Sequence, residues 1–182
     1  MDATLYNSLA DLLSYPEQQV DMTLAAIENR QSAIGNEVAS FGSAVAGMDV
    51  RALQELFIQT FDLSPMCSLE MGWHLFCENY DRGLLLVKIR QLLRGHGVEE
   101  GAELPDHITY ALRLVPRMEA VEAEYFVEAV VLPALQKMLA ALHGKNNPYE
   151  RVLLAANQLL AGDFPNIQIN RAARGAALRV LA

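Results

Sequence analysis

Two carboxylate–histidine pairs come nearest to a catalytic or metal-binding motif in this sequence. Glu70 with His74, and Glu103 with His107, each have the spacing that places two side chains on one face of a helix. A di-iron helical bundle instead uses two Glu-x-x-His pairs and two further inward glutamates. Both pairs here have a longer spacing and begin in expected loops. Solvated or capping side chains are the preferred interpretation, so we predict no metal site.

Other enzyme signatures are absent from the sequence. It contains no HExxH, GxSxG, P-loop or GxGxxG pattern, so we predict no catalytic residues and no cofactor. Cys67 and Cys77 are too few for a disulfide framework or a four-ligand zinc site. A free cysteine is usually a small buried apolar side chain, although the two could also bind a soft metal. They fit a reduced, cytoplasmic protein.

Large apolar side chains are concentrated between positions 61 and 76. Methionine and aromatic side chains adapt to apolar peptide surfaces and are enriched in binding sites. Core packing is the alternative for each of them. The group consists of Phe61, Met66, Leu69, Met71, Trp73 and Phe76.

An acidic stretch follows at residues 99–128. It holds eight acids and only two bases, Arg113 and Arg117, and it surrounds the turn at residues 104–107. A concave acidic surface would attract a basic peptide and accelerate its capture. A solvated face that keeps the protein soluble is the alternative. Asp106 and His107 lie at an expected helix start, where Asp106 can satisfy free backbone N–H groups. His107 could donate to a peptide carbonyl or change charge near neutral pH.

Apolar residues recur at helical spacing along most of the chain. Alanine and leucine total 53 residues, whereas valine, isoleucine and threonine total 24, and this balance favours helices. We predict an all-α fold, a single-domain bundle of about seven to nine helices. The helices are expected at residues 5–15, from Pro16 to Gly35, at 38–45, from an Asp49 cap to Phe61, from an Asn79 or Asp81 cap to Gly95, from Pro105 to Pro116, at 119–142 with a bend or a break at Pro133, and from Pro148 to Gly162. Residues 62–77 should form an irregular loop with a short helical piece.

Composition and charge exclude several classes of protein. Of the 182 residues, 52% are hydrophobic and 20% charged, unlike a disordered chain. A net charge of −8 argues against nucleic acid as the main partner. The longest apolar run, residues 129–135, is far shorter than the ~20 residues of a membrane span, and the N-terminus lacks the form of a signal peptide. We therefore predict no direct membrane insertion.

The last part of the chain has the opposite charge. Residues 164–182 contain Arg171, Arg174 and Arg179 and no acid, so residues 1–163 carry −11. We predict a helical domain at residues 1–163 and a basic tail at 164–182, either a mobile arm or a short amphipathic helix.

Four segments stand out in their order along the chain: LADLLSYP at residues 9–16, the loop that ends in FDLSPMCSL at 61–69, ENYDRG at 78–83 and ELPDH at 103–107. Together, in this order, they resemble the TorD/DmsD/NarJ superfamily of chaperones that mature molybdenum redox enzymes. The likeness covers roughly residues 5 to 160. The DRG and ELPDH elements are most similar to the nitrate reductase branch, whereas the stretch WHLFC at 73–77 does not match that branch closely.

The resemblance implies an all-helical, non-catalytic cytoplasmic chaperone without its own cofactor. Its client would be the apo catalytic subunit of a molybdopterin oxidoreductase, bound by its basic N-terminal segment, often a twin-arginine signal or its remnant. Binding would last until the molybdenum cofactor is inserted, and would prevent early export or membrane docking. The client could act on nitrate, selenate, chlorate or perchlorate, dimethyl sulfide or ethylbenzene. The chaperone itself could be a monomer or a homodimer.

The expected site residues fall into two groups. Polar and apolar contacts to the client peptide are expected from Phe61, Trp73, Phe76, Tyr80, Glu103, Leu104, Pro105, Asp106 and His107. Structural roles are expected for Tyr15, Pro16, Pro65, Ser68, Arg82 and Gly83, with Arg82 paired to an internal carboxylate. A metal-binding enzyme on a helical bundle and a generic helical adaptor are the alternative functions.

Overall fold

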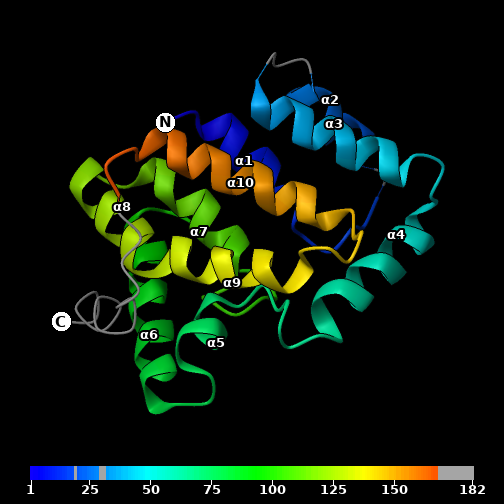
Figure 1. Ribbon diagram of the computed structural model, residues 1–182. Coiled ribbons are helices and arrows are strands. Elements are labelled where there is room, and N and C mark those ends of the chain that lie inside the picture. Colours follow the sequence, from blue (N-terminus) through cyan, green and yellow to red (C-terminus); the bar gives the residue numbers. More distant parts are fainter. Residues whose placement is uncertain (19, 29–31, 168–182) are drawn as a thin grey trace.

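The computed structural model describes residues 1–18, 20–28 and 32–167, and these form an all-α domain without a β-strand. Figure 1 shows the order of the helices. They are α1 (Ala3–Leu12), α2 (Asp21–Glu28), α3 (Ala33–Val45), α4 (Val50–Phe57) continued by the π turn η1 (Ile58–Asp62), α5 (Met71–Phe76), α6 (Tyr80–Gly95), α7 (Ile108–Leu114) with the 3₁₀ turn η2 (Val115–Arg117), α8 (Ala120–Phe126), the π turn η3 (Val127–Val131), α9 (Leu132–Leu142) and α10 (Tyr149–Asp163). Because α8, η3 and α9 form one continuous helix, the described residues hold nine helices, which confirms the predicted fold class.

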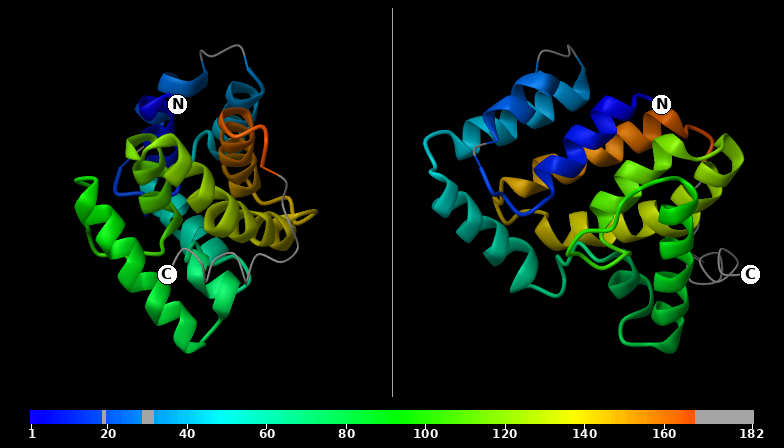
Figure 2. Two further views of the ribbon diagram at one scale, coloured as in Figure 1. Left: turned by 90° about the vertical axis from the view of Figure 1, so that its left-hand side faces the viewer. Right: turned by 180° about the vertical axis from the view of Figure 1, so that it is seen from behind.

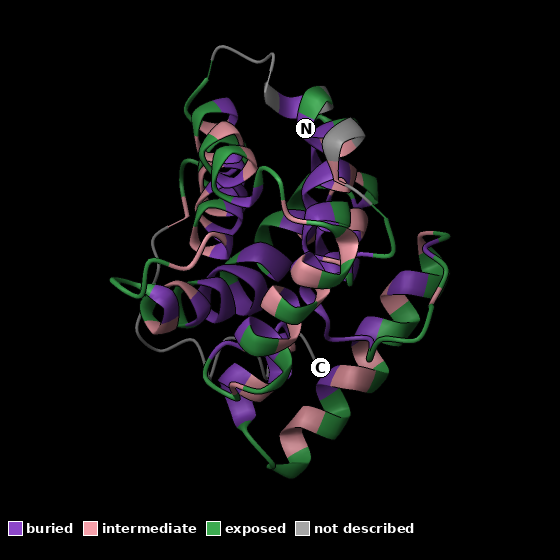
Figure 3. Cartoon of the chain, turned by 90° about the vertical axis from the view of Figure 1, so that its right-hand side faces the viewer, coloured by how far each residue is buried: buried purple, intermediate pink, exposed green. Residues whose placement is uncertain are grey.

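The centre of the bundle is formed by α1, α7, α9 and α10. Helix α10 packs against α1, α3 and α9, and α1 packs against α7. The paired helices α2 and α3 cover one side, whereas α6 lies at the edge of the bundle, as the rotated views in Figure 2 show. Buried residues line the inward faces of the helices and exposed residues the outer faces and loops (Figure 3).

Several helices begin at caps that are visible in the sequence. Asp49 Oδ1 accepts the N–H of Ala52 at 2.8 Å, and Asn79 Oδ1 accepts the N–H of Asp81 at 3.1 Å. Each bond satisfies an N–H group that has no partner inside its own helix. The predicted cap of α4 is confirmed, and of the two expected caps for α6 the structure has Asn79.

Two helix starts differ from the prediction. Helix α2 begins at Asp21, not at Pro16. Gly35, the expected end of that helix, lies instead inside α3, because Ser32 Oγ accepts the Gly35 N–H at 3.2 Å and so caps α3. Helix α7 begins at Ile108, not at Pro105. There, residues 104–107 form a turn closed by the His107 N–H to the Leu104 carbonyl at 2.9 Å.

Pro133 changes the pitch of its helix without splitting it. Proline has no N–H to donate to the carbonyl four residues earlier. The helix adapts through the π turn η3, in which the Leu132 N–H donates to the Val127 carbonyl, five residues back. Proline thus stands in the first turn of α9, a position that tolerates it.

The continuous helix Ala120–Leu142 is long and apolar enough to cross a membrane by length and composition. This differs from the expectation based on uninterrupted apolar runs, because the run at residues 129–135 extends on both sides into further apolar positions. In the bundle, 61% of its most apolar window is buried against other helices. The helix therefore serves as the central core helix of this fold.

The predicted domain boundary falls near the end of the described part. Phe164 is buried and Ile167 packs against the core. The rest of the predicted basic tail, residues 168–182, lies outside the described residues.

Candidate functional site

Two loops that are distant in the sequence are joined by a short piece of antiparallel backbone pairing. Glu70 and His107 form an isolated bridge, with the Met71 N–H donating to the Asp106 carbonyl at 2.8 Å and the Ile108 N–H to the Leu69 carbonyl at 2.9 Å. The apolar loop at residues 61–76 and the acidic turn at 104–107 therefore form one site.

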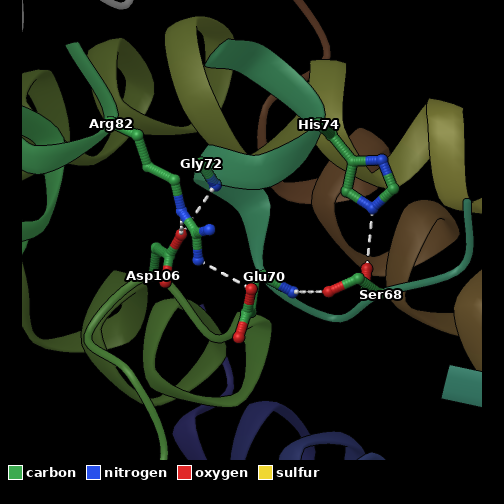
Figure 4. Close-up of polar contacts among 6 residues, drawn as sticks. All are labelled: Ser68, Glu70, Gly72, His74, Arg82 and Asp106. Carbon is green, nitrogen blue, oxygen red and sulfur yellow. Dashed lines mark hydrogen bonds and ion pairs between the residues drawn. The ribbon is translucent and has the colours of Figure 1, made fainter. Parts of the chain in front are cut away.

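A buried ionic network fixes this junction. Asp106 is fully buried, and its Oδ2 accepts the Gly72 N–H at 3.1 Å and Arg82 Nε at 3.3 Å (Figure 4). Arg82 Nη2 also donates to Glu70 Oε2 at 2.6 Å, so the guanidinium lies between two carboxylates from different loops. The expectation that Arg82 pairs with an internal carboxylate is confirmed.

Asp106 acts here as a cap for another helix. Glu70, the residue that precedes α5, makes no side-chain cap, and Asp106 instead satisfies the Gly72 N–H in the first turn of α5. Burial raises the pKa of the Asp106 carboxyl, and the charge of Arg82 opposes that rise. Because its side chain is enclosed, Asp106 is placed to orient the loop, not to touch a bound peptide.

Gly72 is required by this contact. A Cβ at this position would lie 2.6 Å from Asp106 Oδ2 and 3.1 Å from Arg82 Cγ. Glycine allows the backbone to approach the carboxylate closely. In the sequence, Gly72 is one residue of the expected irregular loop at residues 62–77, and its contact with Asp106 appears only in the fold.

A cavity of about 410 Å³ opens beside the network. Aromatic rings of Phe57, Phe61 and Trp73 line it together with Leu69 and Pro65. Its polar lining is formed by Ser68, His107, Arg82 and three carboxylates, Asp62, Glu70 and Glu103.

The π turn η1 contributes to this lining. In η1 the Leu63 N–H donates to the Ile58 carbonyl, five residues back, so each turn holds one residue more than in an α-helix. Residues five apart then lie on a similar face, and Phe57 and Asp62 both line the cavity together with Phe61. Such π turns occur often at functional sites.

The cavity carries negative charge that is only partly compensated. Burial, followed by repulsion from Glu70, raises the pKa of Asp62. Burial raises the pKa of Glu103 as well, with repulsion from Asp62 and Glu70 adding to it. Arg82 is already paired with Glu70 and Asp106, which leaves Asp62 and Glu103 without an ion-pair partner among the described residues. A bound cation would relieve this repulsion.

His107 lies at the base of the cavity as a neutral side chain. It is buried, its Nδ1 lies 2.7 Å from Thr109 Oγ1, and it accepts the Thr109 N–H at 3.4 Å. Burial and the nearby positive charge of Arg113 lower the pKa of His107 to about 4. The idea that His107 changes charge near neutral pH is therefore wrong, because desolvation opposes its protonation.

A second cavity of about 520 Å³ adjoins the first, and Glu103 lines both. Tyr15 and Pro16 line the second cavity, and the Tyr15 ring meets the ring of Phe57 edge-on with centroids 5.8 Å apart. Three further carboxylates in its lining, Asp11, Glu17 and Glu99, stand against Arg113. Together the two cavities form an acidic groove, defined here by the lining of both.

Most of the expected site residues surround this groove, but several do not. Phe76 is buried in the core, because it lies on the inward face of α5, so its expected contact with a client is wrong for this structure. Tyr80 is exposed at the start of α6 and lines neither cavity; Leu104 is exposed and Pro105 is buried in the turn beside it. At Gly83 the described residues place no atom within 4 Å of a Cβ, so nothing explains a glycine there.

The two carboxylate–histidine pairs do not converge on a common point. His74 Nε2 lies 2.6 Å from the Ser68 carbonyl, whereas Glu70 faces Arg82. Cys67 is buried, as expected for a core cysteine, but Cys77 is exposed. Within the described ranges no three His, Cys, Asp or Glu side chains are grouped so that they could hold a metal ion.

Three residues that matter most were not assigned to a site from the sequence. In the sequence, Asp62 and Gly72 are simply parts of the expected irregular loop at residues 62–77, and Glu70 is paired with His74. A signal for Glu70 was present, since a paired arginine needs a carboxylate, but the sequence does not show which of 22 acids provides it.

The chain matches no model of a known protein family. No curated protein sequence matches it either. A functional assignment therefore rests on the residues and their arrangement.

Proposed function

We propose that this chain is a cytoplasmic maturation chaperone that binds the basic N-terminal segment of an apo molybdopterin oxidoreductase catalytic subunit. The observation that carries the proposal is the groove in which Asp62 and Glu103 stand beside Phe57, Phe61 and Trp73. The protein would hold its client until the molybdenum cofactor is inserted, before export or membrane docking. The client would be a nitrate reductase or a related enzyme.

The chemistry of the groove suits arginine. A guanidinium forms charge-assisted and often bidentate hydrogen bonds with carboxylates, and its flat face stacks on aromatic rings. Trp73 already has Arg82 at 5.9 Å from its ring centroid, which illustrates this type of contact. The apolar part of the lining suits the hydrophobic stretch that follows the arginines in such a segment.

The buried network would hold the parts of the chain that line the groove in fixed positions relative to one another. Asp106 and Arg82 join α5, α6 and the turn at residues 104–107, and so they orient Glu70 and Trp73 without contacting the peptide. In this proposal Asp106 and Arg82 are positioning residues.

The resemblance to the TorD/DmsD/NarJ superfamily supports the same function. Its segments supply Tyr15 and Pro16, Phe61 and Ser68, Arg82, and Glu103 and His107. Residues from all four segments line one of the two adjoining cavities. Because these segments line one binding surface, their occurrence together in one sequence has a physical reason.

The first experiment identifies the client. The tagged chain is used to capture proteins from its own cells, and we expect a molybdopterin catalytic subunit among them. Capture of partners without any molybdoprotein would favour the helical adaptor instead. Stoichiometric iron, zinc or molybdenum in the pure protein would favour the metal enzyme.

The second experiment tests the groove with the N-terminal peptide of the captured subunit. Trp73 is the only tryptophan of the chain and lines the groove, so its fluorescence reports binding directly. We expect the peptide to bind, and the same peptide with its arginines changed to glutamine to bind at least ten times more weakly. Equal binding of both peptides would contradict the proposal.

Matched variants distinguish the effect of the groove carboxylates on peptide binding from the effect of the overall negative charge. Asp62→Asn combined with Glu103→Gln should weaken binding of the peptide at least tenfold. Glu119→Gln combined with Glu124→Gln removes the same charge from exposed positions that line neither cavity, and should leave binding almost unchanged.

A further inference from the structure

The chain itself contains a segment with the chemistry that the acidic groove would select. Residues 168–182 read QINRAARGAALRVLA, with Arg171, Arg174 and Arg179 and no acid. Apolar residues follow the first two arginines closely. The segment thus combines separated guanidinium groups with an apolar stretch, as the groove combines carboxylates with aromatic rings.

The segment is long enough to reach the groove from where the described structure ends. Ile167 packs against the core and fixes this starting point. Fifteen residues span up to about 50 Å when extended. A domain of this size has a radius of gyration of about 15 Å and a diameter of about 40 Å, so the extended segment is longer than the domain is wide.

The charges of the two parts are complementary. The carboxylates in the lining of the two cavities are Asp11, Asp62, Glu17, Glu70, Glu99 and Glu103, against Arg82 and Arg113. Asp11 is paired with Arg113 at 2.6 Å and Glu70 with Arg82 at 2.6 Å, whereas Asp62, Glu103, Glu17 and Glu99 have no ion pair among the described residues. Of these four, Asp62 and Glu103 lie beside the aromatic rings of the first cavity, where an arginine of the segment would be most stabilised.

We propose that residues 168–182 are an internal ligand that occupies the acidic groove of its own chain until a client segment displaces it. This inference rests on the proposed function of the groove and adds its regulation. An occupied groove would reject weakly basic peptides, because a tethered competitor acts at an effective concentration in the millimolar range. Only a segment with higher affinity would be captured.

The test uses the full chain and a labelled synthetic peptide of residues 168–182 as the probe. Fluorescence anisotropy measures binding of this probe to the unchanged chain and to a chain with Arg171→Gln, Arg174→Gln and Arg179→Gln. We expect the glutamine variant to bind the probe ten- to a hundredfold more tightly, because its own tail no longer competes.

Two further variants control for charge and for the groove. A chain with the same three arginines changed to lysine keeps the positive charge but loses the bidentate and stacking contacts, so its affinity for the probe should lie between those of the unchanged chain and the glutamine variant. Adding Asp62→Asn and Glu103→Gln to the glutamine variant should remove its gain in affinity.

The outcomes separate this inference from the proposed function. Equal affinity of the unchanged chain and the glutamine variant would overturn the internal ligand, while binding of the client peptide would leave the proposed function intact. Failure of the glutamine variant to bind the probe would overturn it too. If the glutamine variant loses its higher affinity for the probe when the protein is diluted, and sedimentation shows a dimer of the unchanged chain, the segment of one chain occupies the groove of a second copy. This result would contradict occupation within one chain.

Discussion

At the scale of single residues, Asp106 links the two halves of the site. Its Oδ2 accepts two hydrogen bonds, from the Gly72 backbone and from Arg82, although the side chain is fully buried. A buried carboxylate is stable only when it is paired and hydrogen-bonded. We therefore expect changes at Asp106 to act first on the stability of the loop and only through it on peptide binding.

Asp106→Asn should lower the free energy of unfolding by about 2–3 kcal/mol. If the asparagine oxygen replaces Oδ2, its amide nitrogen takes the place of Oδ1, which has no hydrogen-bond partner among the described residues. Urea denaturation measures the change. The control is Glu55→Gln, which breaks an exposed ion pair with Arg51 and should cost less than about 0.5 kcal/mol. Equal effects of both variants would contradict a structural role for Asp106.

His107 should make the fold less stable as the pH falls. Its pKa is lowered from 6.5 to about 4 in the folded state, so the unfolded chain binds the proton first. Between about pH 6.5 and 4 this contribution lowers the free energy of unfolding by about 3 kcal/mol in total.

His107→Asn removes this titration and retains a side chain that can cap α7. Urea denaturation at pH 7 and pH 5 should show a smaller loss of stability for the variant than for the unchanged protein. Parallel losses in both proteins would show that His107 does not titrate in this window.

At the scale of elements, the short helix α5 depends on contacts from outside it. It has six residues, no side-chain cap of its own, and an N-terminal turn that is held by Asp106. Short helices are marginal by themselves and owe their stability to tertiary packing. The position of Trp73 in the groove thus depends on residues more than 30 positions away in the sequence.

Two glycines near this junction should respond to alanine in opposite directions. In Gly72→Ala the new Cβ would lie 2.6 Å from Asp106 Oδ2 and 3.3 Å from Leu85 Cδ2, and we expect a loss of about 1–3 kcal/mol. Gly83→Ala adds a Cβ in the first turn of α6, where the described residues leave open space, and should add up to about 0.5–1 kcal/mol.

Thermal and urea unfolding of the two glycine variants measure this contrast. Since both changes add one methyl group to neighbouring elements, each variant serves as the control for the other. A stabilising Gly72→Ala would mean that the close approach between α5 and Asp106 is not needed.

At the scale of the whole molecule, charge is distributed unevenly along the chain. Residues 164–182 are positive, and the rest carries −11 at neutral pH. Six carboxylates and two arginines line the groove, and burial and repulsion raise the pKa values of two of these carboxylates, Asp62 and Glu103. Association with a basic peptide should therefore depend on both salt and pH.

Affinity for the client peptide should fall as the solution becomes more acidic. Because the pKa values of Asp62 and Glu103 are raised, these groups lose their charge at a higher pH than unperturbed carboxylates, which titrate near about 4. Titrations monitored by Trp73 fluorescence from pH 7.5 to pH 4.5 should show full affinity at neutral pH and a progressive loss below it.

The combined variant Asp62→Asn and Glu103→Gln is the control for this profile. It should bind weakly at every pH and show a flatter dependence. A steep loss of affinity that persists in this variant would assign the effect to other groups, and affinity that rises on acidification would contradict an acidic groove.

The sequence by itself determined the class of fold and most helices, because helical periodicity and caps such as Asp49 are local properties. It also indicated Trp73, Phe61, Arg82 and Glu103 as site residues. Only the tertiary structure decided which apolar residues of the loop enter the core, as Phe76 does, and which face the groove. It also decided that Asp106 is buried, that Arg82 pairs with Glu70 and Asp106, and that His107 stays neutral. These outcomes depend on desolvation and on contacts between distant segments, which local patterns do not encode.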